Sequence, residues 1–117
     1  MLAKKFLLTK KDIGVFARSR TLQYLGSRVR LRACLGRHVT RVHRARFAFV
    51  VSSKVRRNAF ARNAVRRRMA EIVRHLQPNM KAGGEFVFFL TLHDKKAPST
   101  KQLKDDIIRL LKQCGVL

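Results

Sequence analysis

The chain has 117 residues, 46% of them apolar, and carries 28 lysines and arginines against 6 aspartates and glutamates, a formal net charge of +22. The length favours a single domain over residues 1–117, and the apolar fraction excludes a disordered chain. Self-repulsion of this size weakens a compact fold, so the charge points to a polyanionic partner rather than to a merely solvated surface.

The positive charge is concentrated in the first two thirds of the chain. Residues 1–75 hold 21 basic and 2 acidic side chains, and 16 of those 21 are arginine; residues 76–117 hold 7 basic and 4 acidic side chains. The planar guanidinium of arginine makes paired hydrogen bonds to phosphates and stacks on bases, whereas lysine acts as a point charge. A nucleic-acid-binding surface is therefore expected in the first two thirds.

The remaining global features favour a cytoplasmic location without membrane association. Cys34 and Cys114 lack the spacing of a metal or redox motif, which fits a reducing compartment. No apolar run approaches the roughly 20 residues that span a bilayer, and the apolar stretch at residues 6–8 is too short for a signal peptide. Arginines and serines in residues 18–28 leave an organellar targeting sequence as an alternative.

The first half of the chain predicts one helix and two strands. Thr9, followed three residues later by Asp12, is a variant of the capping box and predicts a short helix over residues 9–17. Residues 29–35 alternate strictly and predict a half-exposed strand. Its apolar face is Val29, Leu31, Ala33 and Leu35, and its other face is Arg30, Arg32 and Cys34. After a basic connection at residues 36–44, a second strand is expected over residues 46–53, with Phe47, Phe49 and Val51 on one face.

The second half predicts two helices and an inner strand. Residues 58–76 are helical by period, ending before Pro78, and a turn follows at residues 83–84. The apolar stripe of that helix is Ala61, Val65, Met69, Ile72 and Leu76. Residues 85–92 (EFVFFLTL) are apolar on both faces and predict an inner strand covered on both sides.

The last predicted element is a helix over residues 99–113. Ser99 and Gln102 form a capping box at its start, and Gly115 suits its end. Its buried stripe is Ile107, Leu110 and Leu111, whereas Asp105 and Asp106 are expected in a solvated N-terminal turn. The order of elements predicts an α+β domain with one sheet.

The helix at residues 58–76 carries the strongest functional signal. Opposite its apolar stripe lie Asn63, Arg67, Ala70 and Arg74, with Arg66 flanking them and Arg62 at the border. Arginines stacked on one exposed face repel each other, and a phosphate backbone along that face removes the repulsion. Asn63 adds a donor and an acceptor for a ribose or a base edge. The predicted RNA-binding residues are Lys54, Arg56, Arg57, Arg62, Asn63, Arg66, Arg67 and Arg74.

The stretch KVRRNAFARNAVRRRMAEIVR resembles the signature of the bacterial ribonuclease P protein component. In that family a strand leads through lysines into a helix marked Arg-Asn-Arg, then a hydrophobic residue, then two basic residues. Here Arg62 and Asn63 match the first two positions, and Ala64 departs from the third. The later positions are matched by Val65, Arg66 and Arg67, and Lys54 matches a lysine of the approach.

The resemblance covers most of the chain and implies a fold, a function and partners. The implied fold is a small single-domain α/β sandwich, with one mostly four-stranded sheet, three helices and a left-handed β-α-β crossover. The implied partners are the catalytic RNA of ribonuclease P and precursor tRNA with its 5′ leader, with no obligate protein partner. The RNA subunit of that family cleaves the phosphodiester with Mg²⁺ held mainly by RNA, so we expect no catalytic or metal-binding residue in this chain.

The family binds the 5′ leader in a cleft between the first helix and the sheet. Phe16 matches the phenylalanine that ends the family's first-helix pattern. Arg30 and Arg32, with Phe47 and Phe49 nearby, predict a basic groove with aromatic platforms for single-stranded RNA. The predicted leader-binding residues are Phe16, Arg30, Arg32 and Phe47. Core packing is the alternative for the phenylalanines and is the expectation for Phe86, Phe88 and Phe89.

Two other function classes remain open from the residues themselves. A small basic ribosomal protein that neutralises rRNA has the same charge and predicts cosedimentation with ribosomal subunits. An autonomous nuclease needs converging carboxylates or histidines, and the six acidic residues are scattered along the chain. His38 and His43 lie in a basic stretch, where RNA contact is favoured over metal ligation, and Cys34 with His38 lacks further zinc ligands.

Overall fold

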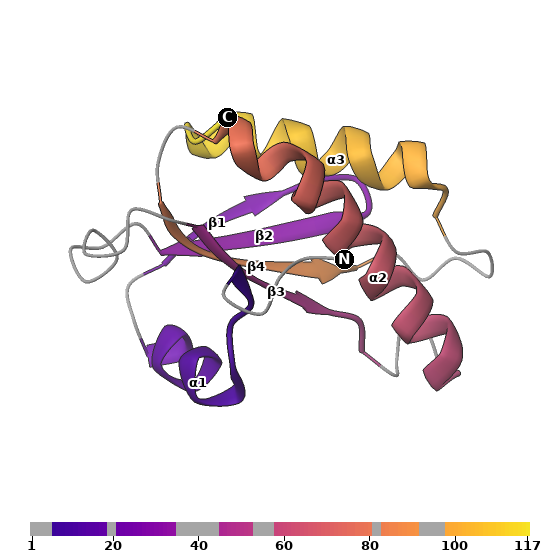
Figure 1. The fold of residues 1–117 in the computed structure, drawn as a ribbon, viewed down its shortest axis with the longest axis horizontal. Coiled ribbons are helices and arrows are strands. Elements are labelled where there is room, and N and C mark those ends of the chain that lie inside the picture. Colours follow the sequence, from indigo (N-terminus) through magenta and orange to yellow (C-terminus); the bar gives the residue numbers. More distant parts are fainter. Residues whose placement is uncertain (1–5, 19–20, 35–44, 53–57, 81–82, 92–97) are drawn as a thin grey trace.

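The structure is a computed structural model that describes residues 6–18, 21–34, 45–52, 58–80, 83–91 and 98–117. In this part of the chain, a four-stranded sheet has two α-helices on one face and one on the other (Figure 1). The elements are α1 (Lys10–Arg18), β1 (Leu22–Leu25), β2 (Val29–Cys34), β3 (Ala45–Val50), α2 (Ala59–Leu76), a 3₁₀ turn (Gln77–Asn79), β4 (Gly84–Leu90) and α3 (Thr100–Cys114).

The strand order in the sheet is β1-β2-β4-β3. Strand β2 pairs antiparallel with β1 and β4, whereas β3 pairs parallel with β4. Adjacent parallel strands cannot be joined by a tight turn, and α2 provides the long connection between β3 and β4. These features confirm the predicted fold class: an α+β arrangement with one four-stranded sheet, three helices and a β-α-β crossover unit.

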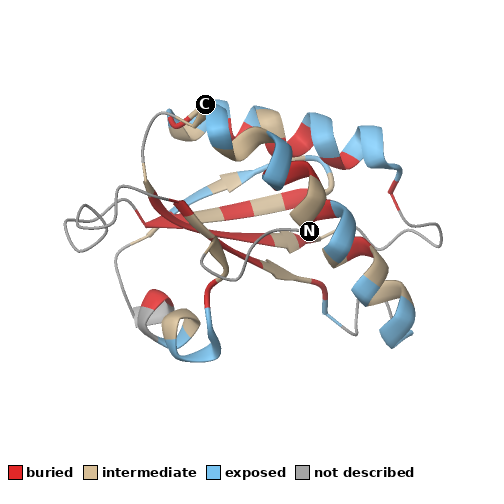
Figure 2. Cartoon of the chain, viewed as in Figure 1, coloured by how far each residue is buried: buried red, intermediate tan, exposed pale blue. Residues whose placement is uncertain are grey.

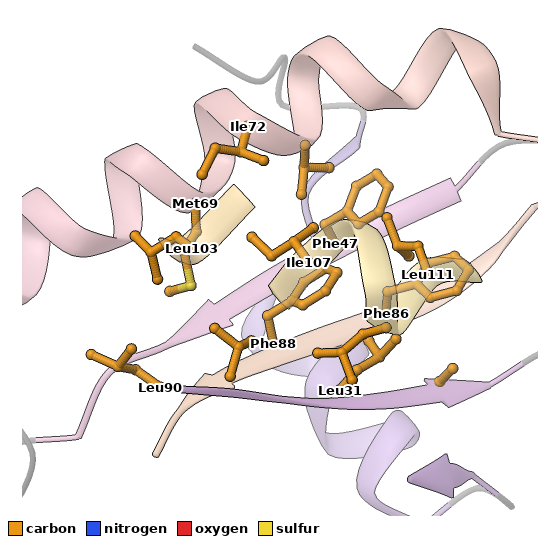
Figure 3. Close-up of a cluster of buried hydrophobic side chains, with 14 of the residues drawn as sticks. Leu31, Phe47, Met69, Ile72, Phe86, Phe88, Leu90, Leu103, Ile107 and Leu111 are labelled. Atoms are coloured by element: carbon orange, nitrogen blue, oxygen red, sulfur yellow. The ribbon is translucent and has the colours of Figure 1, made fainter. Parts of the chain in front are cut away.

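The inner position of β4 confirms the prediction from its continuous apolar sequence. Six of its seven residues are buried, because β2 and β3 cover its edges and helices cover its faces. Phe86 and Phe88 point toward α2 and α3 and are fully buried with Met69, Leu103 and Ile107 (Figure 3). This larger core holds α2 on the sheet.

A smaller core lies on the opposite face of the sheet, under α1. It is formed by Leu8, Phe16, Cys34, Ala48 and Val87. The alternation along the strands separates the two cores, since neighbouring residues point to opposite faces. Figure 2 shows the buried residues of the helices on the sides that face the sheet.

Side-chain caps fix where the helices begin. The backbone N–H of Thr9 donates to Asp12 Oδ2 at 2.9 Å, and the N–H of Asp12 donates to Thr9 Oγ1 at 3.1 Å, as the capping-box variant predicts. Asn58 Oδ1 accepts from the first turn of α2. Ser99 and Gln102 form the predicted reciprocal box of α3. That helix ends at Gly115, whose φ of 87° is the left-handed conformation that glycine adopts without strain.

Strand β1 was not located by the sequence pattern. Its sequence LQYL has no apolar alternation, and Leu22 and Leu25 are 56% and 71% exposed. The chain turns back at Gly26, where a Cβ would lie 2.7 Å from the carbonyl oxygen of Val29, and all four residues of β1 pair with β2. The sheet pairing, rather than burial, therefore defines this edge strand.

The expectation of a solvated Asp106 was wrong. Asp106 is 2% exposed, and its Oδ2 accepts from the backbone N–H groups of Arg28 at 2.6 Å and Val29 at 3.1 Å. Its Oδ1 accepts from Arg109 at 2.8 Å. Helix α3 begins at Thr100, so Asp106 lies beyond the first turn and joins the helix to the β1–β2 turn. Asp105 is exposed, as expected.

Three parts of the prediction lie outside the described residues: the basic connection 36–44 with His38 and His43, the strand-to-helix approach 53–57, and the ends of two strands at Leu35 and Leu92. Among the helices that the structure describes, none is long and apolar enough to cross a membrane.

Candidate nucleic-acid interface

Helix α2 has the buried and exposed faces that its sequence predicts. Val65, Met69 and Ile72 are buried against the sheet and α3, as predicted, and Val73 joins them. The predicted outer line is exposed at Asn63, Arg67 and Arg74, whereas Ala70 is half-buried and packs against the core. Ala61 and Leu76, at the two ends of the predicted apolar stripe, are also only half-buried.

Two arginines at the centre of this outer face differ in their contacts. The guanidinium of Arg66 donates to Asn63 Oδ1, so these two side chains form one local group of donors. Arg67 is exposed, and no hydrogen bond or ion pair joins it to another residue of the described chain. A phosphate can therefore bind Arg67 without first displacing a partner that the structure describes.

Arg74, at the end of the same line, has an internal partner. Its Nε and Nη2 donate to Glu71 Oε1 at 3.1 Å and 2.6 Å. The hydrogen bonds from Arg74 are the largest cause that lowers the pKa of Glu71 to about 2, and the same pair raises the pKa of Arg74. Glu71 is therefore ionised at neutral pH, and it neutralises part of the positive face.

The structure describes only some of the other basic residues near this surface. Arg62 is half-buried on the first half of α2, at the border that the helical period predicts. Lys54, Arg56 and Arg57 lie outside the described residues. Arg68 is exposed but donates to the carbonyl oxygen of Pro98 at 3.4 Å, which connects α2 to the segment before α3.

A groove of about 790 Å³ runs beside α2 and the edge strand β3. Its floor is apolar and comes from β3, α1 and the segment before α1, through residues that include Ala48, Phe49 and Ile13. From α2 it is lined by Ala64, Arg66, Arg67, Arg68, Ala70 and Glu71. The small side chains of Ala64 and Ala70 leave this part of the helix open to close approach.

A second cluster of arginines lies on the sheet face that α1 partly covers. Arg30 on β2 is the register partner of Phe89 on β4, and its guanidinium carbon lies 4.5 Å from the centre of that ring. Arg32 donates to Thr21 Oγ1 at 2.9 Å and lies 5.6 Å from the ring of Phe16. Both guanidinium groups thus lie over aromatic rings, a favourable cation–π arrangement.

The aromatic residues that the sequence predicted beside Arg30 and Arg32 need correction. Phe47 and Phe49 lie on the opposite face of the sheet, where Phe47 is fully buried and stacks on Phe86 at 5.6 Å. Phe16 is on the correct face but only 2% exposed, beneath Arg32. Phe89, expected in the core, is the half-buried aromatic beside Arg30. The register between β2 and β4 creates this pair, and a single sequence does not reveal that register.

Arg46 on β3 connects α1 to the sheet on this face. Its guanidinium donates to Asp12 Oδ2, and it lies 3.9 Å from Glu85 Oε2. The N–H of Thr9 is the largest cause that lowers the pKa of Asp12, and Arg46 lowers it further. Arg46 therefore holds the first helix in place. Across the described ranges, no three histidine, cysteine, aspartate or glutamate side chains gather closely enough to hold a metal ion.

Comparison with known proteins identifies the family. The family model described as Ribonuclease P matches residues 2–115, nearly the whole chain. The chain belongs to the ribonuclease P protein family. The ribonuclease P protein component of Xanthomonas euvesicatoria is 36% identical over 72 residues, covering 62% of this chain and 48% of that protein. The component of Chloroflexus aurantiacus is 42% identical over 72 residues, covering 62% of this chain and 53% of that protein. The chain thus matches about half the length of these curated relatives.

Solved structures of the family share the fold. The RNase P protein of Staphylococcus aureus superposes with a TM-score of 0.77 at 16% identity, covering 95% of this chain and 96% of that chain. The RNase P protein of Thermotoga maritima, in complex with 1-(4-fluorophenyl)-2-thiourea, gives a TM-score of 0.76 at 16% identity, covering 91% and 97%. The sheet and three helices are therefore those of the family.

Proposed function

We propose that this chain is the RNA-binding protein subunit of ribonuclease P and assists a catalytic RNA in removing the 5′ leader from precursor tRNA in the cytoplasm. The outer face of α2 carries the proposal: Asn63, Arg66 and Arg67 are adjacent, and Arg67 has no partner among the described residues. They occupy the positions of the family motif, and the chain's net charge of +22 favours an RNA partner.

In this proposal the phosphodiester is cleaved by the RNA subunit, with Mg²⁺ held mainly by RNA and none bound by the protein alone. Three of the six acidic side chains support this division of labour. Asp12, Glu71 and Asp106 each accept hydrogen bonds from an arginine. A carboxylate engaged in this way is poorly suited to act as a metal ligand or general base.

The leader of precursor tRNA is proposed to bind the sheet face beside α1. Arg30 and Arg32 stay in the predicted set, and Phe89 takes the position that the sequence assigned to Phe47. The Nε of Arg30 is buried without a hydrogen-bond partner, so this guanidinium is held chiefly by the ring of Phe89. Phe16 forms part of the floor beneath Arg32.

Reconstitution tests the proposal. Purified protein, ribonuclease P RNA and precursor tRNA are combined at low Mg²⁺, and the rate of 5′ maturation is compared with that of the RNA alone. Clear stimulation is expected with no second protein added. No stimulation, or cleavage by the protein without the RNA subunit, would contradict the proposed function.

A further inference from the structure

Phe60, in the first turn of α2, is exposed without a packing role in the described chain. Its side chain is 74% exposed, more than Leu22 or Leu25, the other exposed large apolar residues in the part of the chain that the structure describes. It belongs to neither hydrophobic core. Its backbone N–H donates to Asn58 Oδ1 at 2.8 Å, so the helix cap fixes the position from which the ring projects. Single exposed apolar residues are common, and exposure alone assigns no role.

The position of Phe60 relative to the outer face of α2 supplies the second observation. Asn63 and Arg67 follow it by three and seven residues and therefore lie on the same side of the helix. The neighbours Ala59, Ala61 and Ala64 are small, and the first turn of α2 contains no acidic residue. An accessible ring thus stands at one end of a line of phosphate-binding donors. Figure 2 shows this end of α2 exposed and projecting beyond the sheet.

We infer that Phe60 stacks on an unpaired base of the RNA whose phosphates bind Asn63, Arg66 and Arg67. This inference rests on the proposed function and names the kind of RNA feature that α2 binds. Bases inside an A-form helix are not accessible to a side chain from the deep major groove, whereas unpaired bases of loops and bulges stack on aromatic rings. The surrounding positive charge favours RNA over an apolar protein partner for this ring.

Alanine and leucine substitutions separate stacking from other contacts. Phe60→Ala should weaken binding to ribonuclease P RNA roughly 5- to 100-fold, the range for loss of one base–aromatic stack. The salt dependence of binding should not change, because no charge is removed. Phe60→Leu keeps an apolar side chain without an aromatic face and should also weaken binding. Leu25→Ala is the matched control, because Leu25 is similarly exposed on the edge strand β1 and should leave affinity unchanged.

Tryptophan substitution tests the stack directly. The chain contains no tryptophan, so Phe60→Trp introduces a single fluorescent reporter and should retain affinity. Its emission should be quenched when the RNA binds, whereas that of Leu25→Trp should not change. Wild-type affinity of Phe60→Ala or Phe60→Leu, or unquenched emission of Phe60→Trp in the complex, would overturn the inference alone. Failure of the wild-type protein to prefer ribonuclease P RNA over a scrambled RNA of equal length would overturn the proposed function and the stack together.

Discussion

The arginines of α2 and those of the sheet differ in what they contact, although the sequence makes them look equivalent. On α2, Arg66 bonds only to the neighbouring Asn63, and Arg67 has no partner in the described chain. On the sheet, Arg32 is bonded to Thr21, the residue before β1, and Arg46 is bonded to Asp12 of α1. Arg67, which is exposed, and Arg66, which is half-buried, can turn to a phosphate without breaking a contact between elements, whereas Arg46 cannot. Net charge therefore indicates an RNA partner but overstates the number of arginines available to it.

The largest effect is expected from replacing an arginine that holds the fold. Arg46→Met removes the contact with Asp12, which joins α1 to the sheet, and the contact with Glu85 on the neighbouring strand β4. Hydrogen bonds to charged groups contribute a few kcal/mol, so the free energy of unfolding should fall by about 2 kcal/mol. Urea denaturation measures this change. An unchanged stability would show that Arg46 is as dispensable for the fold as the arginines of α2.

Replacing Arg67 on α2 by methionine should weaken RNA binding and leave the stability of the fold unchanged. Arg67→Met keeps a good helix former, so the melting temperature should stay within about 1 °C of the wild type. Affinity for ribonuclease P RNA should fall roughly 3- to 10-fold, and the slope of log affinity against log salt should decrease by about 0.7–0.9 for one lost phosphate contact. Filter binding at several salt concentrations measures both quantities. A lower melting temperature with an unchanged slope would mean that the outer face of α2 is misassigned.

The partner of Arg46 should make the fold sensitive to acid. The pKa of Asp12 in the folded chain is below its ordinary value of 3.8, first because of the N–H of Thr9 and then because of the Thr9 hydroxyl and Arg46. Its carboxylate therefore stabilises the fold fully above about pH 4, and this contribution is lost as the pH falls through the lowered pKa. Asp12→Asn should be less stable than the wild type at pH 6, and the difference should shrink between about pH 4 and pH 2. A difference that stays constant over this range would contradict the assignment.

The smallest change in RNA affinity is expected from replacing Glu71, the acidic residue of α2. Glu71→Gln removes a carboxylate whose pKa of about 2 keeps it ionised at neutral pH, and it releases Arg74 from its closest partner. Binding to ribonuclease P RNA should tighten by about twofold, because a like charge no longer opposes the phosphates. Weaker binding would show instead that Glu71 orients Arg74 for the RNA.

Periodicity and capping predicted most of the fold because those signals are local. The helix caps at Thr9 and Ser99, and the continuous apolar run of β4, all depend on residues close in sequence. Strand β1 was missed because pairing to β2, and not burial, makes it a strand. Asp106 was misassigned because its partners at Arg28 and Val29 are more than 75 residues away. The crossover between β3 and β4 came from the family resemblance, since no local pattern specifies it.

The residues of the candidate site likewise fall into those that a local pattern places and those that only the tertiary structure places. The helical period placed Asn63, Arg67 and Arg74 on the outer face of α2 correctly. The arrangement of the arginines on the sheet required the strand order and register, which put Phe89 beside Arg30 and Phe47 on the opposite face. The sequence did not single out Phe60, because its proposed role depends on the ring being exposed. A lone phenylalanine in a predicted helix does not show whether its side chain is buried or exposed.

Arginine-selective chemical modification with and without RNA separates the arginines that bind RNA from those that hold the fold. The protein is treated with phenylglyoxal alone or with ribonuclease P RNA without precursor tRNA, and mass spectrometry measures modification at each arginine. Arg66 and Arg67 should be strongly modified in the free protein and protected in the complex, whereas Arg46 should react slowly and equally in both. Protection of Arg46 with continued reactivity of Arg66 and Arg67 would contradict the assignment of α2 as the surface that binds the catalytic RNA.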